Sequence, residues 1–134
     1  QIEEIDGFEK LTHLTVLDIR RNQISNIHSL ENLTDIKELY ISNNRISDIS
    51  SIAGMKKLTY LSASYNRIED ISVLSDKTDL TVLVLNNNKI TDISVLRNLK
   101  KINHLKIRGN QIEDTSPLDE YPETNYLDIT LQKY

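Results

Sequence analysis

The sequence predicts a curved repeat solenoid of the α/β type, with a parallel β-sheet on its concave face and 3₁₀ or extended segments on its convex face. Three observations predict it. Apolar residues recur every 22 positions, an asparagine recurs with them, and within each repeat the apolar spacing changes from two to three. Repeats of this length indicate units that bury their apolar faces only against their neighbours.

Single columns of the sequence show the repeat. One apolar column consists of Leu17, Leu39, Leu61, Leu83, Leu105 and Leu127. The pattern divides the chain into a partial coil 1–13, full coils 14–35, 36–57, 58–79, 80–101 and 102–123, and a partial or capping coil 124–134. We expect residues 1–134 to form a single domain. Because the chain starts in mid-pattern without a methionine, we also expect it to be a piece of a longer protein.

The front of each coil has the spacing of a β-strand. Leu17 and Ile19 are two positions apart, so both point inward, whereas Val16, Asp18 and Arg20 point outward. Applied to every coil, the same alternation predicts parallel strands near 16–20, 38–42, 60–64, 82–86, 104–108 and 126–130.

The back of each coil has a different spacing. Ile24, Ile27, Leu30 and Leu33 are each three positions apart, which keeps them on one face only if the chain turns every three residues. This spacing predicts 3₁₀ turns or extended chain rather than long α-helices. Burying an apolar side chain of this kind contributes roughly 1.5–3 kcal/mol, so the stacking of coils is expected to drive folding.

Two polar columns are expected to stabilise or shape the backbone. One is an unbroken asparagine column, whose amides can donate to and accept from backbone groups that the bend leaves unpaired. It consists of Asn22, Asn44, Asn66, Asn88 and Asn110. The other contains residues that tolerate a left-handed backbone, so it predicts a positive φ. It consists of Asn32, Gly54, Asp76 and Asn98.

An aspartate column has two interpretations. Its members are Asp48, Asp70, Asp92 and Asp114. These residues either cap the short turn behind the sheet or form a cation-binding ladder, because stacked carboxylates about 5 Å apart repel one another. Arg45, Arg67 and Lys89 lie three positions before three of the acids and are expected to neutralise them.

A third charged column alternates in sign. It contains Asp35, Lys57, Asp79, Lys101 and Glu123. Neighbouring coils would attract each other, whereas a slip by one whole coil would place like charges together. We therefore expect this column to fix the register, with each exposed pair contributing about 0.2–1 kcal/mol.

The repeat is irregular at two places. Lys77 interrupts the apolar column of Leu33, Met55 and Leu99. Near the carboxyl end the apolar positions loosen, which suggests that the repeat is ending there. Three tyrosines are expected to help close this end of the core: Tyr121, Tyr126 and Tyr134.

Composition and motifs argue against several function classes. Net charge is −4 with scattered basic residues, which does not predict a nucleic-acid-binding stripe, and no apolar run is long enough to cross a membrane. The chain has no cysteine, so thiolate metal sites and disulfides are excluded. His13, His28 and His104 fall in different columns, and no glycine-rich phosphate loop is present. We expect no enzyme activity, no cofactor and no metal.

The outward strand positions are the candidate site. An apolar, tyrosine-rich centre with charged flanks is the usual layout of a protein-binding surface, so the expected partner is another protein. The alternative is that strand propensity alone placed tyrosine and valine there. The candidate residues are Tyr40, Tyr60, Val82 and Val84 in the centre, Tyr65 at the rim, Arg20 at one end, and His104, Lys106 and Arg108 at the other.

The coil pattern LxxLxLxxNxIxxIxxLxxL matches the 22-residue class of leucine-rich repeat over nearly the whole chain. Within that class, residues 44–50 (NRISDIS) and 88–94 (NKITDIS) resemble the repeats of bacterial internalin-like surface proteins. The resemblance implies a secreted or wall-attached adhesion or invasion factor that binds a host protein through its concave face. Compared with a full member of that family, we expect residues 1–134 to lack the N-terminal cap and the anchoring segment.

Some regulatory subunits of intracellular protein phosphatases use the same coil. A cytoplasmic scaffold or regulatory subunit is therefore the alternative to a surface or secreted protein.

Overall fold

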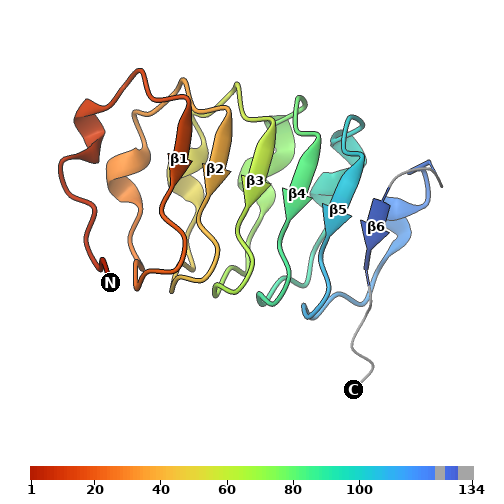
Figure 1. The fold of residues 1–134 in the computed structure, drawn as a ribbon. Helices are drawn as coiled ribbons and strands as arrows, with labels where there is room; N and C mark the ends of the chain where they lie inside the picture. Colours follow the sequence, from red (N-terminus) through yellow and green to blue (C-terminus); the bar gives the residue numbers. More distant parts are fainter. Residues whose placement is uncertain (123–125, 130–134) are drawn as a thin grey trace.

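The computed structural model describes residues 1–122 and 126–129, and it shows the predicted solenoid (Figure 1). Each coil contributes one strand, and the strands form a parallel sheet in sequence order. The strands are β1 (Val16–Asp18), β2 (Glu38–Tyr40), β3 (Tyr60–Ser62), β4 (Val82–Val84), β5 (His104–Lys106) and β6 (Tyr126–Asp128).

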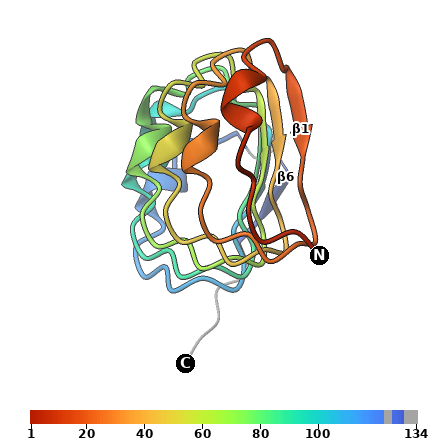
Figure 2. The ribbon, with the colours of Figure 1, turned by 90° about the vertical axis from the view of Figure 1, so that its left-hand side faces the viewer.

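Short 3₁₀ helices occupy the opposite side, as Figure 2 shows in a view along the solenoid. They are η1 (Phe8–Lys10), η2 (His28–Leu30), η3 (Ser50–Ile52), η4 (Ser72–Asp76), η5 (Ser94–Asn98) and η6 (Ser116–Leu118). Within the described residues the convex side contains no α-helix, so the apolar spacing of three predicted its structure correctly.

Each strand spans three residues, so the strands are shorter than the ranges that the sequence predicted. Pairing nevertheless continues past them: the Ile19 N–H donates to the Tyr40 carbonyl at 2.9 Å, and the Arg21 N–H donates to the Ser42 carbonyl at 3.0 Å. At Arg21 the backbone turns left-handed, with φ 59°, and the extended conformation ends.

The core lies between the sheet and the 3₁₀ helices and consists of the repeated leucines and isoleucines, most of them fully buried. Lys77 is the exception in its column, yet its side chain is also 0% exposed. Its Nζ donates to the Ala53 carbonyl at 2.9 Å and to Asp76 Oδ1 at 3.0 Å. The methylene stem thus fills the apolar position while the ammonium group finds polar partners.

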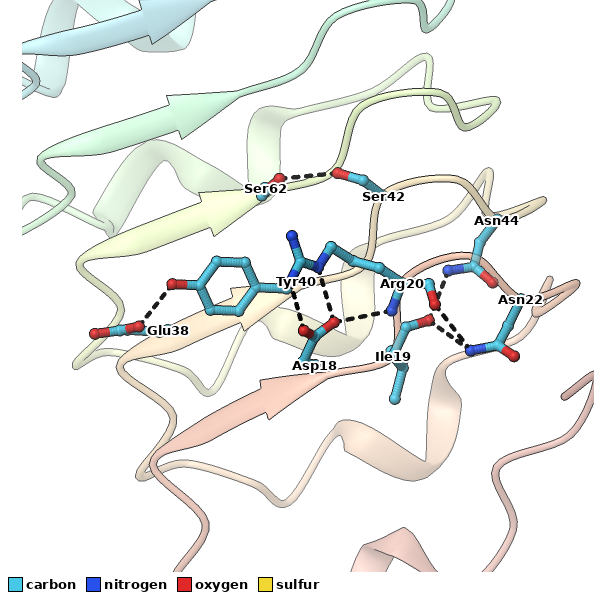
Figure 3. Close-up of polar contacts among 9 residues, drawn as sticks. All are labelled: Asp18, Ile19, Arg20, Asn22, Glu38, Tyr40, Ser42, Asn44 and Ser62. Atoms are coloured by element: carbon cyan, nitrogen blue, oxygen red, sulfur yellow. Dashed lines mark hydrogen bonds and ion pairs between the residues drawn. The ribbon is translucent and has the colours of Figure 1, made fainter. Parts of the chain in front are cut away.

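The asparagine column forms the expected hydrogen-bonded ladder. Asn66 Nδ2 donates to the carbonyls of Ile41 at 2.9 Å and Ala63 at 3.1 Å, while its Oδ1 accepts the Ile46 N–H at 3.0 Å. One amide therefore joins two coils. Asn22 and Asn44 both reach the Ile19 carbonyl, and Figure 3 shows them just beyond the ends of their strands.

The prediction of positive φ in the column of Asn32, Gly54, Asp76 and Asn98 is wrong. Apart from Gly7, the left-handed residues of the described chain lie instead one position before the asparagine ladder: Arg21, Asn43, Tyr65, Asn87 and Gly109, with φ between 55° and 71°. The sharp bend occurs where the strand ends, whereas Asp76 and Asn98 lie inside right-handed 3₁₀ helices. Gly54 serves close packing, since a Cβ there would lie 3.3 Å from the Glu31 carbonyl oxygen.

The aspartate column stabilises the convex turns. Asp48 Oδ1 accepts the N–H of Ser50, the first residue of η3, at 2.8 Å, and this hydrogen bond lowers the pKa of Asp48. Asp70, Asp92 and Asp114 do the same for η4, η5 and η6. The turn-capping interpretation is therefore confirmed, although the bond starts one position before the formal cap, Ile49.

The expected neutralisation of these acids is not seen. In the described part of the chain, no ion pair within 4.0 Å joins Arg45, Arg67 or Lys89 to the aspartates. Lys89 contacts Glu69 instead, at 3.7 Å.

The charge column predicted to fix the register forms separate pairs rather than a continuous ladder. Lys57 Nζ lies 2.6 Å from Asp35 Oδ1, and Lys101 Nζ lies 2.6 Å from Asp79 Oδ1. Between these pairs the chain uses neighbouring lysines: Lys56 reaches forward to Asp76, and Lys100 reaches forward to Glu120. Consecutive coils are therefore linked in turn. Glu123 lies outside the described residues.

The carboxyl end is closed by Tyr121. Its hydroxyl lies 2.8 Å from the Leu96 carbonyl oxygen and 2.9 Å from that of Leu99, and burial raises its pKa to about 12. Tyr126 points instead to the sheet face and is 53% exposed. Tyr134 lies outside the described residues. No helix among the described residues has the length and apolarity needed to cross a membrane.

Candidate interaction surface

The outward side chains of the six strands form the concave sheet face. Parallel register places the first residues of the strands side by side, as in Tyr60 beside Val82, and the third residues likewise, as in Tyr40 beside Ser62. Side chains far apart in sequence thus lie on adjacent strands about 4.8 Å apart.

An aromatic group occupies the N-terminal half of this face. The rings of Tyr40 and Tyr60 lie 4.9 Å apart and are tilted by 36°, and the Arg20 guanidinium lies 5.0 Å from the Tyr40 ring centre. Asp18 holds Arg20 through two hydrogen bonds of 2.7 and 2.9 Å (Figure 3). The stack of cation and rings is therefore ordered before any partner arrives.

The Tyr40 hydroxyl also has a fixed partner. It donates to Glu38 Oε2 at 2.7 Å, and this hydrogen bond to a carboxylate raises the pKa of Tyr40 to about 12. Tyr40 is therefore neutral at physiological pH and is held at both the ring and the hydroxyl.

A second aromatic group occupies the C-terminal half. His104 stacks on Tyr126 at 4.7 Å with 14° between the ring planes, and Lys106 Nζ lies 5.5 Å from the centre of the Tyr126 ring. Val82 and Val84 lie half-buried between the two groups. Tyr126 thus belongs to the sheet face, although its place near the end of the repeat predicted that it would help to close the core.

The outermost column of the sheet face differs from expectation. By the alternation that points Arg20 outward, Ser42 and Ser64 should also point outward, but both are only 6% exposed. Their hydroxyls accept backbone N–H groups of the next coil at 3.0 Å, from Ser64 and Asn86 respectively, and Asn86 Oδ1 accepts the N–H of Arg108 at 3.0 Å. This second ladder was detectable from the short oxygen-bearing side chains in the column.

The two remaining candidates lie at the edge where the strands end. Tyr65 is 56% exposed and has a φ of 56°, and Arg108 is exposed just beyond β5. The sheet therefore brings together Tyr40 and Tyr60 with Arg20, and separately His104 with Lys106. Tyr65 is not part of either stack.

Among the described residues, no cluster of three or more histidine or carboxylate side chains is placed to hold a metal ion. His13 and His28 lie beside Asp35 and Glu31, at 3.6 and 3.5 Å, away from His104 on the sheet face.

Comparison with known proteins gives the same fold. Leucine-rich-repeat family models match residues 4–46 and 13–68, and a two-copy model matches residues 78–120. No curated protein matches the chain. A leucine-rich-repeat protein of Leptospira interrogans is 28% identical, with 84% of this chain and 30% of that protein covered and a TM-score of 0.78.

Two solved internalins of Listeria monocytogenes are more similar. Internalin C2 is 32% identical, with a TM-score of 0.92, and internalin F is 32% identical, with a TM-score of 0.90. The matches cover 98% and 100% of this chain, which spans 57% of internalin C2 and 39% of internalin F. Proteins of this kind are typically non-catalytic binding modules. The chain therefore belongs to the leucine-rich-repeat family, and its repeats are internalin-like.

Proposed function

We propose that the chain is a non-catalytic recognition module of an exported bacterial protein, secreted or held at the cell surface, that binds a host protein through its concave sheet face. One observation carries the proposal. Tyr40 and Tyr60 stack on each other under Arg20 on the open side of the sheet, outside the core that holds the coils together. The likeness to the two internalins supports the exported, adhesive role.

The energetics of interfaces favour this face. Tyrosine and arginine are enriched among the few residues whose truncation costs 2 kcal/mol or more in protein complexes. Here the rings and the guanidinium are already held by stacking and by Asp18. Because ordering side chains is one of the costs of association, a pre-ordered cluster loses less entropy on binding.

The charged flanks have a different expected role. Arg20 lies at one end of the face, and Lys106 and Arg108 lie at the other. Charges at the edge of an interface act mainly by steering the encounter. Neutralising Lys106 and Arg108 is therefore expected to slow association and reduce its salt dependence, with little effect on dissociation.

The test uses the Tyr40→Ala/Tyr60→Ala double variant. Fluorescently labelled protein is titrated onto cultured host cells, with and without protease treatment that removes their surface proteins. The variant should bind protease-sensitive sites at least about tenfold more weakly than the parent chain, and its melting temperature should barely change. A matched control, Ser75→Ala/Asn98→Ala, alters exposed residues on the convex side and should bind normally.

Equal binding by the parent chain and the tyrosine variant, with lost binding by the convex control, would move the site off the sheet face. An absence of any protease-sensitive binding by the parent chain would contradict the host-surface role. That result would favour the cytoplasmic scaffold or regulatory subunit instead.

A further inference from the structure

A column of cations runs along the edge where the strands end. We call Arg45, Arg67 and Lys89 the basic rim; all three side chains are exposed. Their backbone N–H groups each donate to the preceding coil, at 2.8, 2.8 and 2.9 Å, which sets them in register. Backbones paired in this way lie about 4.8 Å apart, so three positive side chains project from neighbouring positions.

The fold does not use these charges. In the part of the chain that the structure describes, neither Arg45 nor Arg67 has a carboxylate oxygen within 4.0 Å, and Lys89 has only Glu69 at 3.7 Å. The aspartates three positions later, Asp48, Asp70 and Asp92, instead hold the convex turns by accepting serine N–H groups. Like charges at matching positions of adjacent coils repel, so the basic rim opposes the stacking of coils.

Tyr65 is a second unexplained feature of the same edge. It adopts a left-handed φ of 56° in a column that also contains Asn43, Asn87 and Gly109, and in which Arg21 is the other long side chain. Asparagine and glycine tolerate this conformation, whereas a bulky side chain is disfavoured there. The ring is nevertheless 56% exposed, so packing does not explain it. Strained residues of this kind concentrate at functional sites.

We propose that the basic rim and Tyr65 together dock an acidic, extended peptide segment of the protein partner, an inference that rests on the proposed function. Guanidinium groups pair with carboxylates through two parallel hydrogen bonds. An extended segment that alternates acids with apolar residues uses both the cations and the exposed ring. Tyr65 directly follows Ser64 at the end of the sheet face, so one partner can contact both surfaces.

The probe is a fluorescein-labelled peptide of alternating glutamate and leucine, about ten residues long, which exceeds the span of the three coils. Binding is measured by fluorescence anisotropy at low salt. Arg45→Gln/Arg67→Gln should weaken binding about tenfold or more, because it removes the two unpaired guanidinium groups. The control Lys10→Gln/Lys37→Gln removes the same charge from exposed positions away from the rim and should change binding by less than about twofold.

Tyr65→Asn separates a binding role from a structural one. It should weaken peptide binding while leaving the melting temperature unchanged or higher, because asparagine suits the left-handed position. A lower melting temperature together with normal binding would show that Tyr65 serves the fold, and would contradict the proposal.

Three other outcomes would overturn the proposal: no peptide binding, equal weakening by both glutamine variants, or binding of a heparin fragment through Arg45 and Arg67 when the peptide does not bind. The last outcome would identify a sulfated polysaccharide as the occupant. Tyr40→Ala/Tyr60→Ala should leave peptide binding unchanged, so the rim and the concave sheet face can fail independently.

Discussion

Replacing Asn66 by alanine tests how the inner ladder stabilises the solenoid. The side chain makes three principal hydrogen bonds, but their loss is unequal. The Ile41 carbonyl keeps a bond from Asn44 at 3.1 Å, and the Ala63 carbonyl keeps one from Asn88 at 3.0 Å. Only the N–H of Ile46, a residue that is 0% exposed, loses its partner completely. One stranded buried donor costs about 1–3 kcal/mol, which is the expected loss in the free energy of unfolding.

Asn22→Ala is the matched control. Asn22 accepts the N–H of Ile2, but this bond is exposed, so water can replace it. The expected loss is about 0.5–1 kcal/mol, the net value of an ordinary hydrogen bond. Urea denaturation followed by circular dichroism measures both variants. A loss below about 0.5 kcal/mol for Asn66→Ala, the scale of ordinary surface substitutions, would refute the reasoning, as would equal losses at the two positions.

Two further predictions concern charge. Lys57 lies in the column between Asp35 and Asp79, so the Lys57→Glu variant should be less stable than the Lys57→Ala variant. The difference between their free energies of unfolding should shrink in high salt. Equal stabilities at low salt would contradict the register role. Asp70 and Asp92 have lowered pKa values because each accepts a serine N–H, so their stabilising effect is complete above about pH 4 and is lost as the pH falls further. Urea midpoints measured between about pH 6 and pH 3 should fall less steeply for Asp70→Asn/Asp92→Asn than for the parent chain.

The sequence was sufficient to predict features that depend on burial. Because only an apolar residue is stable inside a stack of coils, the column from Leu17 to Leu127 and the columns spaced by three residues show which side chains form the core. The asparagine ladder was predictable for the same reason, since a buried polar group must be satisfied in every coil.

Backbone conformation was harder to predict from residue type. The left-handed column contains Arg21 and Tyr65 beside residues that favour that conformation. The column of Asn32, Gly54, Asp76 and Asn98 has the residue types typical of a left-handed backbone, yet its glycine serves close packing. Lys77 was also ambiguous, because a lysine can either interrupt a core or bury its stem and pair its ammonium group. Only the positions of Ala53 and Asp76 distinguish these cases. The role of the outward tyrosines stays a prediction.

The repeat assigns stability and recognition to different columns. Inward residues must be nearly the same in each coil, because each contacts its own counterparts above and below. Outward residues on the sheet meet no such requirement, so Tyr40, Tyr60, Val82 and His104 can differ from coil to coil without breaking the stack. Departures from the repeat on the outer surface therefore leave the stacking of coils intact, and these positions are free to serve recognition. The aromatic stack is a place where such departures gather, whereas the basic rim repeats a cation in three consecutive coils; in each of them neighbouring coils contribute to one continuous surface.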